Sequence, residues 1–467
     1  MTGHRALPAG RAALMAYGMR VYAICLDAGL ELAPPSLCAG CGAEGLTAVT
    51  DSERTSFSCG SCGLCWQVEL GWVHRVDGQG RGARHPLSCS PAHDRRLIIR
   101  IGLIAPPWLP VPPPGYGGTE VVIDNLARGL QALGHDVRLF TVGDSTCPVS
   151  REFLYPTEVT PMDADIPEAA HVLAAYDALA DVDIIHDHTI LGPLVAGRRG
   201  IRQPPVVTTN HGLFTSQTRR IFAEVARHAS IVAISHSQAL ASGGIPIAAV
   251  IHHGIDLEVY QPGPGDGGYL LFVGRMCADK GVHLAVRVAR RAGQRLVIVA
   301  KMHEPAERAY FEQRVRPLLE PGDEMPAEQP LASRIELLSR AAALLNPITW
   351  REPFGLVMVE ALASATPVLA FPNGAAPEII DQGRTGYLCR DERQMITAVG
   401  RVPEIERRQC RDAAERRFSL ARMALDHQRL YRRILGDPGQ LGRRSAACAT
   451  AAPDRREYRG TASRAQQ

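Results

Sequence analysis

The sequence predicts an α/β protein in which two parallel-sheet domains follow a small cysteine-rich segment. Three observations support this fold class. Short apolar strands alternate with helical stretches from Leu97 onward, the alternation restarts at Tyr269, and paired cysteines gather before residue 95. Strands that alternate with helices are typical of a parallel sheet covered on both faces. We therefore expect two Rossmann-like domains that face each other across a cleft, with ligands bound at the carboxyl ends of the strands.

The length and composition of the chain are consistent with this domain organisation. The chain has 467 residues, of which 46% are hydrophobic and 21% are charged, enough to build two or three domains. The net charge of +3 is too small to indicate nucleic-acid binding. No uninterrupted apolar run reaches the ~18 residues of a membrane-spanning helix. The amino-terminal apolar stretch is interrupted by Arg20 and lacks a convincing cleavage site, so we expect a cytoplasmic protein.

The first segment, residues 1–95, carries two CxxC pairs separated by seventeen residues. This spacing is typical of a zinc ribbon, in which four thiolates form a closed, structural site for zinc. The predicted ligands are Cys38, Cys41, Cys59 and Cys62. Coincidental clustering is the alternative. The scattered cysteines are interpreted as inert core thiols without a role: Cys147, Cys277, Cys389, Cys410 and Cys448.

The sequence indicates the binding partner of the predicted zinc ribbon less specifically than its metal ligands. Residues 36–75 contain four acidic residues and two arginines, a balance that disfavours binding to a phosphate backbone. Trp66 and Trp72 suit either a ribbon core or a docking surface. We favour a structural or protein-docking segment over a nucleic-acid-binding one.

The first α/β domain is expected over residues 96–258. It begins with the strand Leu97–Ile104 and a proline-rich loop that ends in Gly115-Tyr-Gly-Gly-Thr-Glu120. An amphipathic helix follows from about Thr119 to Leu133, and Gly134 is suited to stop it. The next strands are expected at Asp136–Thr141 and in segments that end at Ile185, Thr209, Ile234 and Ile251.

The second α/β domain is expected over residues 268–405, after a turn-rich linker at residues 261–268. Its strands are predicted at Tyr269–Val273, Leu296–Ala300, Ala343–Leu345, Pro367–Phe371 and Gly386–Leu388. Residues 406–435 are helical and rich in charge. Residues 436–467 lack periodicity and are expected to form a disordered tail.

The most informative motif is Glu352-Pro-Phe-Gly-Leu-Val-Met-Val-Glu360, at a junction between a loop and a helix. Glu352 falls on the loop and Glu360 inside the helix. Unpaired N–H groups of Gly355, Leu356 and Val357 lie between them, and such a helix start attracts anions. Two acids that flank an anion site indicate a ligand with both phosphate and hydroxyl groups, such as a nucleotide-sugar.

From about residue 97 to 434 the chain resembles glycosyltransferase family 4, whose members are retaining enzymes of the GT-B fold. The Glu352–Glu360 motif carries this resemblance, together with Val273-Gly-Arg-Met-Cys-Ala-Asp-Lys-Gly281. Further matches, in the order of the family, are Gly117-Gly-Thr-Glu120, His211-Gly212, Gly254-Ile-Asp256, Thr366-Pro-Val368 and Gly374-Ala-Ala-Pro-Glu378.

The resemblance implies a role for each matched residue. Arg275 and Lys280 would grip the donor diphosphate and stabilise the charge that grows on it. Glu360 would bind the ribose hydroxyls. Glu352 would hold the hydroxyls of the donor sugar, together with the N–H groups of Phe354, Gly355 and Leu356.

Two further contacts come from the first domain. His211 would contact the sugar near the reacting carbon, and Gly117 and Gly118 would let the backbone approach donor or acceptor. For each of these residues a structural role is the alternative: a surface charge for Arg275 or Lys280, a core position for His211, and a turn for the glycines.

Two signals suggest metal ligands. Asp181-Val-Asp183 fits a DxD pattern, but it precedes a strand, and the GT-B resemblance requires no metal. His186-Asp-His188 follows that strand, and acceptor contacts, a metal pair and simple loop structure remain open. We expect no catalytic metal.

The chain also departs from the family pattern. Residues 321–331 lack the apolar strand and glycine that precede the next helix, in a region that shapes the nucleobase pocket in such enzymes. The segment Ala300-Lys-Met302 stands where such enzymes commonly have a glycine next to the lysine. Lys301 is a further candidate contact to the diphosphate.

The predicted reaction is transfer of a sugar from a nucleoside-diphosphate-sugar to an unidentified acceptor, with retention at the anomeric carbon. The acceptor is a sugar, a lipid or a small molecule. The alternatives are a sugar-nucleotide epimerase of similar fold, or a docking or nucleic-acid-binding protein with a non-catalytic GT-B body.

Overall fold

The computed structural model divides the chain into two units, residues 1–97 and residues 98–467. In the first unit it describes only the backbones of four strands. In the second it describes residues 98–115, 117–162, 164–196, 204–326 and 328–436.

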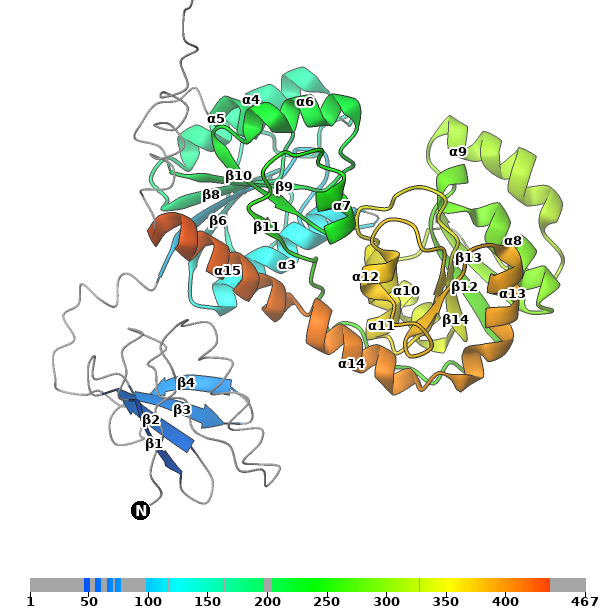
Figure 1. Ribbon diagram of the computed structural model, residues 1–467. Helices are drawn as coiled ribbons and strands as arrows, with labels where there is room; N and C mark the ends of the chain where they lie inside the picture. Colours follow the sequence, from blue (N-terminus) through cyan, green and yellow to red (C-terminus); the bar gives the residue numbers. More distant parts are fainter. Residues whose placement is uncertain are drawn as a thin grey trace, which may run out of the picture. The chain divides into compact units, whose positions relative to one another are not determined.

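The described part of the first unit is an antiparallel sheet in the order β1-β2-β3-β4 (Figure 1). Its strands are Leu46–Thr50, Thr55–Cys59, Cys65–Glu69 and Trp72–Val76. Neighbouring strands are joined by short connections, as is usual for a meander. The thiolates of the predicted zinc site, on Cys38, Cys41, Cys59 and Cys62, lie outside the described residues.

The first α/β domain contains a parallel sheet of seven strands in the order β11-β10-β9-β8-β5-β6-β7. These strands are β5 Arg100–Ile104, β6 Asp136–Thr141, β7 Ser150–Phe153, β8 Ile184–Asp187, β9 Val206–Asn210, β10 Ala229–Ala233 and β11 Ala249–Val250. All four residues of β8 and all five of β9 are buried, because helices cover both faces of a parallel sheet. The edge strand β7 is polar and largely exposed, and the sequence analysis missed it.

The helices of this domain connect successive strands, so their starts lie at the carboxyl ends of the sheet. They are α3 Gly118–Ala132, α4 Asp165–Ala178, α5 Gly192–Ala196, α6 Ser216–Val225 and α7 His236–Leu240. Helix α3 agrees with its predicted span to within one residue at each end. It stops before Gly134, whose positive φ of 83° ends the helical run as predicted.

The second α/β domain contains a parallel sheet of five strands in the order β13-β12-β14-β15-β16. The strands are β12 Tyr269–Arg275, β13 Arg295–Lys301, β14 Ala343–Asn346, β15 Val368–Ala370 and β16 Gly386–Leu388. All five coincide with predicted strands to within two residues. Two parallel-sheet domains were expected from the alternation of strands and helices, and the structure confirms them.

The helical segments of the second domain follow the same alternating pattern. They are η1 Ala278–Lys280, α8 Val282–Arg291, α9 Pro305–Tyr310, η2 Phe311–Val315, η3 Arg316–Leu318, α10 Leu331–Arg340, α11 Leu356–Ala363, α12 Ala376–Ile379, α13 Glu392–Arg401, η4 Val402–Glu404 and α14 Arg407–Phe418. The segment before α10, which lacks the family's apolar strand, reaches the sheet edge by a single bridge between Glu324 and Val297.

The last described helix, α15 Leu420–Gly436, returns to the first domain and packs beside α3 (Figure 1). Its side chains Met423, Ala424, Leu430 and Tyr431 belong to the core of that domain. The chain therefore crosses between the two domains twice, once near residue 260 and once between α14 and α15. No helix in the described ranges is long and apolar enough to cross a bilayer.

Candidate active site

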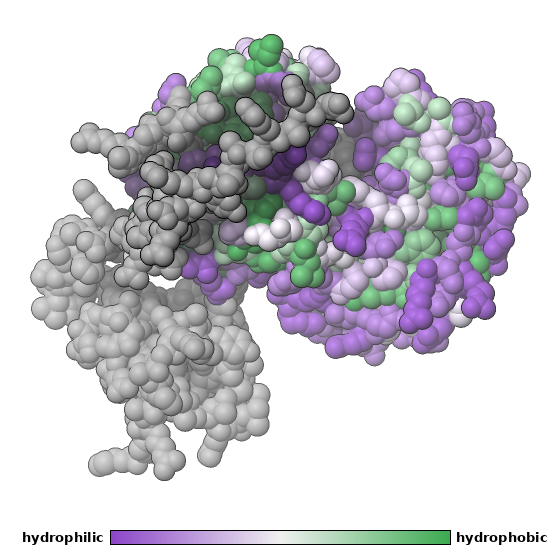
Figure 2. Space-filling view, turned by 45° about the horizontal axis from the view of Figure 1, so that its top comes forward, coloured by the Kyte–Doolittle hydropathy of each residue, from purple (hydrophilic) through white to green (hydrophobic). Residues whose placement is uncertain are grey.

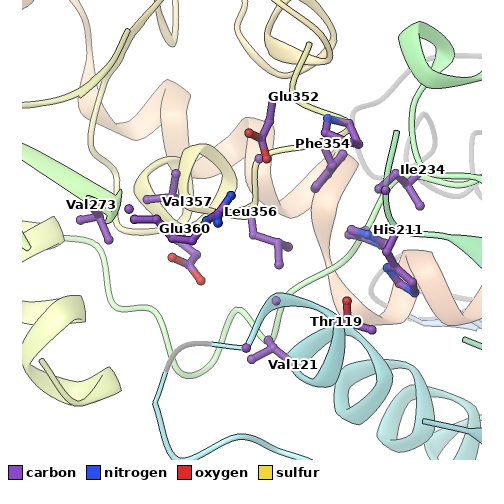
Figure 3. A pocket seen from close by; sticks show the side chains of 18 of the residues that line it. Thr119, Val121, His211, Ile234, Val273, Glu352, Phe354, Leu356, Val357 and Glu360 are labelled. Atoms are coloured by element: carbon purple, nitrogen blue, oxygen red, sulfur yellow. The ribbon is translucent and has the colours of Figure 1, made fainter. Parts of the chain in front are cut away.

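Several of the residues predicted from the sequence line one cavity of about 280 Å³ between the two α/β domains (Figure 3). The second domain contributes the segment from Glu352 to Val357, Glu360 and the end of β12. The first domain contributes the start of α3, His211 and Ile234. The full set of lining residues is Gly115, Gly117, Gly118, Thr119, Val121, His211, Gly212, Ile234, His253, Val273, Gly274, Arg275, Arg334, Trp350, Glu352, Pro353, Phe354, Gly355, Leu356, Val357 and Glu360.

The start of helix α11 forms one wall of this cavity. Gly355 has a φ of +95°, a conformation that favours glycine, and Leu356 and Val357 are the first helical residues. The N–H groups of a first helical turn have no carbonyl partner within the helix, so those of these lining residues are candidate donors for an anion. The predicted junction between loop and helix is confirmed, whereas anion binding at this helix start stays a prediction.

A second glycine buttresses the loop that holds Glu352. Gly374 has a φ of +61°, and a Cβ atom at this position would lie 2.0 Å from the carbonyl oxygen of Glu352. The neighbouring N–H group of Ala375 donates to the same carbonyl at 3.0 Å. The Gly374–Glu378 motif therefore supports the backbone of Glu352 from behind.

Glu360 is held by a tyrosine that sequence reasoning missed. The hydroxyl group of Tyr260 donates to Oε1 of Glu360 at 3.0 Å. Tyr260 is only 5% exposed, and burial together with the negative charge of Glu360 raises its pKa well above the usual value. The phenol therefore stays a hydrogen-bond donor at every physiological pH. This contact fixes one oxygen of the carboxylate and leaves Oε2 for a ligand.

The two candidate cations of the second domain are placed differently. Arg275, at the end of β12, lines the cavity. Lys280 is not among the residues that line the cavity, but its Nζ atom donates to Oε2 of the lining residue Glu352 at 2.6 Å. Both side chains of this ion pair are 13% exposed, and the ammonium group also lies 5.4 Å from the centre of the Trp350 ring. Glu352 and Lys280, predicted to contact different parts of a donor, thus contact each other.

Arg334 is a further basic residue of the cavity that was not predicted. It comes from α10, which follows the segment where the chain departs from the family pattern. Its Nε atom is buried and has no hydrogen-bond partner within the described residues. The sequence does not show that Arg334 lines the cavity, because the position of its side chain depends on how α10 packs against the rest of the domain.

His211 lies at the end of β9 on the first-domain side of the cavity, as predicted. Its Nε2 atom is 2.9 Å from Nδ1 of His188. Burial lowers the pKa of His211 to about 4 and that of His188 well below its usual value. Both rings are therefore neutral near pH 7, and one N–H group is shared between them.

The His186-Asp187-His188 segment divides between the cleft and the core. His188 lies beside His211, whereas His186 is buried between the hydroxyl groups of Tyr431 and Thr209 at 2.6 and 2.8 Å. The carboxylate of Asp187 accepts from Tyr176 and Thr189. Among the described residues no group of three or more His, Cys, Asp or Glu side chains is arranged to hold a metal ion.

The other candidate metal motif forms structural ion pairs. Asp183 pairs with Arg100 at 2.7 Å, and Asp181 pairs with Arg138 at 2.6 Å. These contacts tie the start of β8 to the neighbouring strands β5 and β6. Both carboxylates lie at the amino ends of the strands, away from the cavity.

The adjacent glycines of the first domain have different neighbours. A Cβ atom at Gly117 would lie 2.8 Å from Pro113 and 2.9 Å from a carboxylate oxygen of Glu120, so this position is required by packing within the turn. A Cβ atom at Gly118 would meet only Leu356, at an ordinary 3.7 Å. Gly118 therefore brings the start of α3 close to α11 across the cleft.

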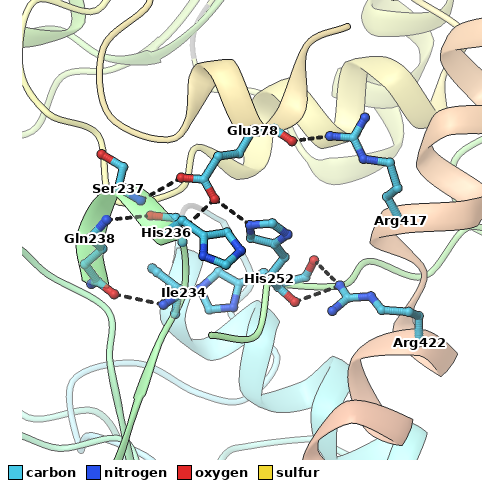
Figure 4. A network of polar contacts seen from close by, with 10 residues as sticks. Ile234, His236, Ser237, Gln238, His252, Glu378, Arg417 and Arg422 are labelled. Atoms are coloured by element: carbon cyan, nitrogen blue, oxygen red, sulfur yellow. Dashed lines mark hydrogen bonds and ion pairs between the residues drawn. The ribbon is translucent and has the colours of Figure 1, made fainter. Parts of the chain in front are cut away.

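A polar network joins the two domains beside the cavity (Figure 4). The Glu378 carboxylate, from α12, accepts from the N–H groups of His236 and Ser237 at 2.8 and 2.7 Å and contacts Nε2 of His252 at 2.8 Å. Burial acts to raise the pKa of Glu378, but hydrogen bonds from His252 and the two N–H groups outweigh it and lower the pKa. The carboxylate thus stays charged and links the second domain to the start of α7 in the first.

Both α/β domains match known families of glycosyltransferases. Residues 116–259 match the family model described as Glycosyltransferase Family 4, and residues 267–404 match the model described as Glycosyl transferases group 1. A D-inositol 3-phosphate glycosyltransferase of Acidothermus cellulolyticus is 28% identical over 392 residues, which cover 68% of this chain and 86% of the relative. A D-inositol 3-phosphate glycosyltransferase 1 of Catenulispora acidiphila is 27% identical, over 62% of this chain and 83% of its own length.

Solved structures share the fold. AviGT4, described as a glycosyltransferase involved in avilamycin A biosynthesis, is 27% identical, with a TM-score of 0.56 over 72% of this chain and 98% of its own. Sucrose-phosphate synthase from Thermosynechococcus elongatus is 22% identical, with a TM-score of 0.62 over 72% of this chain and 99% of its own. The chain is therefore a glycosyltransferase, built on the GT-B fold and similar to family 4.

Proposed function

We propose that this glycosyltransferase moves a sugar from a nucleoside-diphosphate-sugar to a hydroxyl group of its acceptor, with retention at the anomeric carbon. The convergence of both glutamates of the Glu352–Glu360 motif, Arg275, His211 and the start of α11 on one cavity supports this proposal most strongly. A donor contains hydroxyl groups at both ends and a diphosphate between them. The cavity offers carboxylates at two places, with cationic and N–H donors between them.

The nucleotide end of the donor is assigned to Glu360. Its free oxygen would accept hydrogen bonds from the ribose hydroxyls, while Tyr260 holds the other oxygen. A carboxylate that binds a diol contributes more to the binding free energy when its rotamer is already fixed in the free protein, because less conformational entropy is lost on binding. Arg334, which lines the same cavity, is a further candidate for the nucleotide side that was not predicted.

The diphosphate is assigned to Arg275 and to the N–H groups of Gly355, Leu356 and Val357. A guanidinium fork and a helix start both stabilise the negative charge that develops as the sugar departs. Lys280 is assigned to the same charge. Since Lys280 pairs with Glu352 in the ligand-free chain, donor binding would convert this pair into a contact shared with the diphosphate.

The sugar is assigned to Glu352, with the N–H groups of Phe354 to Leu356, and to His211 from the opposite wall. Neutral His211 would hydrogen-bond to a sugar hydroxyl without adding charge near the reacting carbon. Gly118 brings the start of α3 near this point. The glutamates are binding groups in this assignment, not the acid/base pair of a glycoside hydrolase.

In the proposed step the bond between the anomeric carbon and the diphosphate oxygen breaks. A new bond to the acceptor oxygen forms on the same face, and the hydroxyl proton of the acceptor passes to the departing diphosphate. No carboxylate that would serve as a covalent nucleophile is assigned in the described cavity. This front-face exchange requires only that the phosphate charge be stabilised and that donor and acceptor be aligned.

A ligand screen with product analysis tests the proposal. One or more nucleoside-diphosphate-sugars should raise the melting temperature of the full chain, because a ligand that binds only the folded state stabilises it. Nuclear magnetic resonance of the product should show the anomeric configuration of the donor. A product with the inverted anomeric configuration would contradict retention. Conversion of the donor to an epimer without any acceptor would show that the enzyme is an epimerase and not a transferase.

A further inference from the structure

A second cavity, of about 360 Å³, adjoins the proposed donor cavity. The two share Gly117, Gly118, Thr119, His211, Gly212 and Arg275. Because His211 and Arg275 are assigned to the sugar and the diphosphate, a molecule in the second cavity lies beside the bond that breaks. This is where an acceptor has to sit.

One side of the second cavity is apolar. Trp108 and Leu109, from the loop after β5, form its floor, and Trp108 is only 7% exposed. Met162 and Ile190 stand at the rim and are 47% and 42% exposed. Figure 2 shows hydrophobic residues gathered on the first domain, whereas the visible surface of the second domain is mainly hydrophilic. Exposed apolar side chains that line a cavity favour an apolar ligand surface.

The charges in this cavity disfavour a second phosphate group. Of its described lining residues, the cations are Arg275 and Lys301, both at strand ends of the second domain. The first domain contributes the acids Glu120 and Glu168. A phosphate on the acceptor would lie near these acids and would compete with the donor diphosphate for Arg275, the one of these two cations that lines both cavities. Like charges at such distances repel more strongly in a partly buried site.

The helix start that might otherwise bind an acceptor phosphate already has an acid beside it. Glu120 lies in the first turn of α3, is 5% exposed, and folds back toward Gly117. Burial raises its pKa to about 7, so near neutral pH the carboxyl group keeps only part of its negative charge, and Glu168 is the stronger source of repulsion. One oxygen of the Glu168 carboxylate, Oε1, accepts from the N–H groups of Ile190 and Leu191 at 2.8 and 3.1 Å.

The second cavity also contains a polar atom that could form a hydrogen bond to a hydroxyl group of the acceptor. Nε2 of His188 is buried, belongs to a lining residue of this cavity, and has no hydrogen-bond partner in the described ranges. A buried polar atom without a partner costs about 1–3 kcal/mol, which a ligand hydroxyl would recover. The neutral ring donates or accepts according to its tautomer, and its other nitrogen contacts His211.

We propose that the second cavity binds a neutral acceptor that carries a hydroxyl group on an apolar body, and that it rejects an inositol phosphate. The inference rests on the proposed transfer reaction for the acceptor role, but the binding preference stands on the cavity itself. It departs from the acceptor that the names of the inositol 3-phosphate relatives suggest.

The test compares two probes by saturation-transfer nuclear magnetic resonance on the full chain, without nucleotide. Hexyl β-D-glucopyranoside is neutral with an apolar tail, and inositol 3-phosphate is charged and lacks one. The glucoside should bind, and inositol 3-phosphate should displace it only at a concentration at least tenfold above the dissociation constant of the glucoside. Absence of glucoside binding, or displacement by inositol phosphate at or below that constant, would overturn the proposal.

Variants locate the binding. A Met162→Ser/Ile190→Ser chain should bind the glucoside about tenfold more weakly, because both apolar contacts at the rim are lost. Ile166→Ser is the matched control, since Ile166 is 83% exposed on the same domain and does not line the cavity. Equal affinity of the double variant and the control would also overturn the proposal. Failure of every nucleotide-sugar to bind would instead refute the donor assignment and leave this binding preference intact.

Discussion

Single side chains in this enzyme are held by partners that are distant in sequence. Tyr260 and Glu360 are 100 positions apart, and Lys280 and Glu352 are 72 apart, yet each pair forms one hydrogen bond, in which the glutamate lines the cavity. The glutamates were predicted from their local motif. Tyr260 was not predicted at all, and Lys280 was predicted only as a contact to the diphosphate, because no local pattern shows that either side chain points at a glutamate. A short sequence motif can therefore predict candidate ligand-binding residues, but it does not predict the distant residues that orient their side chains.

Tyr260 provides the first prediction at this scale. Tyr260→Phe should raise the KM for the donor about fivefold with little change in kcat, because the loss of one positioning hydrogen bond costs about 1 kcal/mol. Steady-state kinetics with a nucleotide-sugar gives both constants. Tyr269→Phe is the control, since this hydroxyl donates to the carbonyl of Leu337 and does not reach the cavity. An identical KM in the two variants would show that Tyr260 does not orient Glu360.

At the scale of elements, the strands were more predictable than the way in which they are joined. Strands β6 and β16 coincide with their predicted spans, because apolar runs bounded by turn residues are local signals. β7 was missed because its residues are polar and exposed. The return of α15 to the first domain was also missed, since a charged amphipathic helix does not specify which apolar surface covers it.

The contact of α12 with α7 gives a prediction at this scale. Glu378→Gln replaces a charged acceptor of two N–H groups by an amide that satisfies only one of them. We expect a loss of about 1–2 kcal/mol of unfolding free energy and a looser arrangement of the two domains. Urea denaturation measures the first effect, and the radius of gyration from small-angle X-ray scattering measures the second.

Glu392→Gln is the matched control for this contact. Glu392 pairs with Arg287 inside the second domain, so its loss should lower stability without changing the domain arrangement. If the scattering of Glu378→Gln equals that of Glu392→Gln, the network around Glu378 does not hold the domains together.

At the scale of the whole molecule, buried histidines dominate the predicted response to acid. Burial lowers the pKa values of His171, His211 and His427 to about 4, and those of His186, His188 and His253 well below the usual value. These rings are neutral when folded but bind protons near pH 6.5 when unfolded. Between pH 6.5 and 4 the unfolded chain therefore takes up protons at these sites, and stability falls as the pH falls.

Two buried carboxyl groups act in the opposite direction. Burial raises the pKa values of Glu120 and Asp187 to about 7, so they favour the folded state at lower pH. They are fewer than the histidines, and we expect a net loss of stability on acidification. Each net proton corresponds to about 1.4 kcal/mol per pH unit.

Urea midpoints measured from pH 7 to 4 test this balance. His171→Gln should reduce the slope by about one proton, because the ring of His171 lies outside the cavity and its Nε2 atom contacts only the carbonyl of Ala105. Stability that rises on acidification would contradict the predicted protonation states of the histidines.

The arrangement of the cleft was predictable from the sequence only up to a point. The order of strands, the loop at Gly355 and the position of Glu360 followed from local patterns. The family models and relatives confirm that the chain is a glycosyltransferase. The pairing of Lys280 with Glu352, the entry of Arg334 and the division of His186 from His188 depend on packing between elements. The thiolates of the predicted zinc ligands lie outside the described part of the structure, and the zinc site stays a prediction.

Release of nucleoside diphosphate from a stabilising nucleotide-sugar tests the central claim most directly. It should be measured for the native chain and for Glu352→Gln, Glu360→Gln and Glu392→Gln, with folding checked by circular dichroism. We predict that the first two variants lose donor hydrolysis and transfer almost completely, because each loses a carboxylate that binds donor hydroxyls, and that Glu392→Gln keeps them. Full activity of both Glu352→Gln and Glu360→Gln would contradict the assignment of this cavity to the donor.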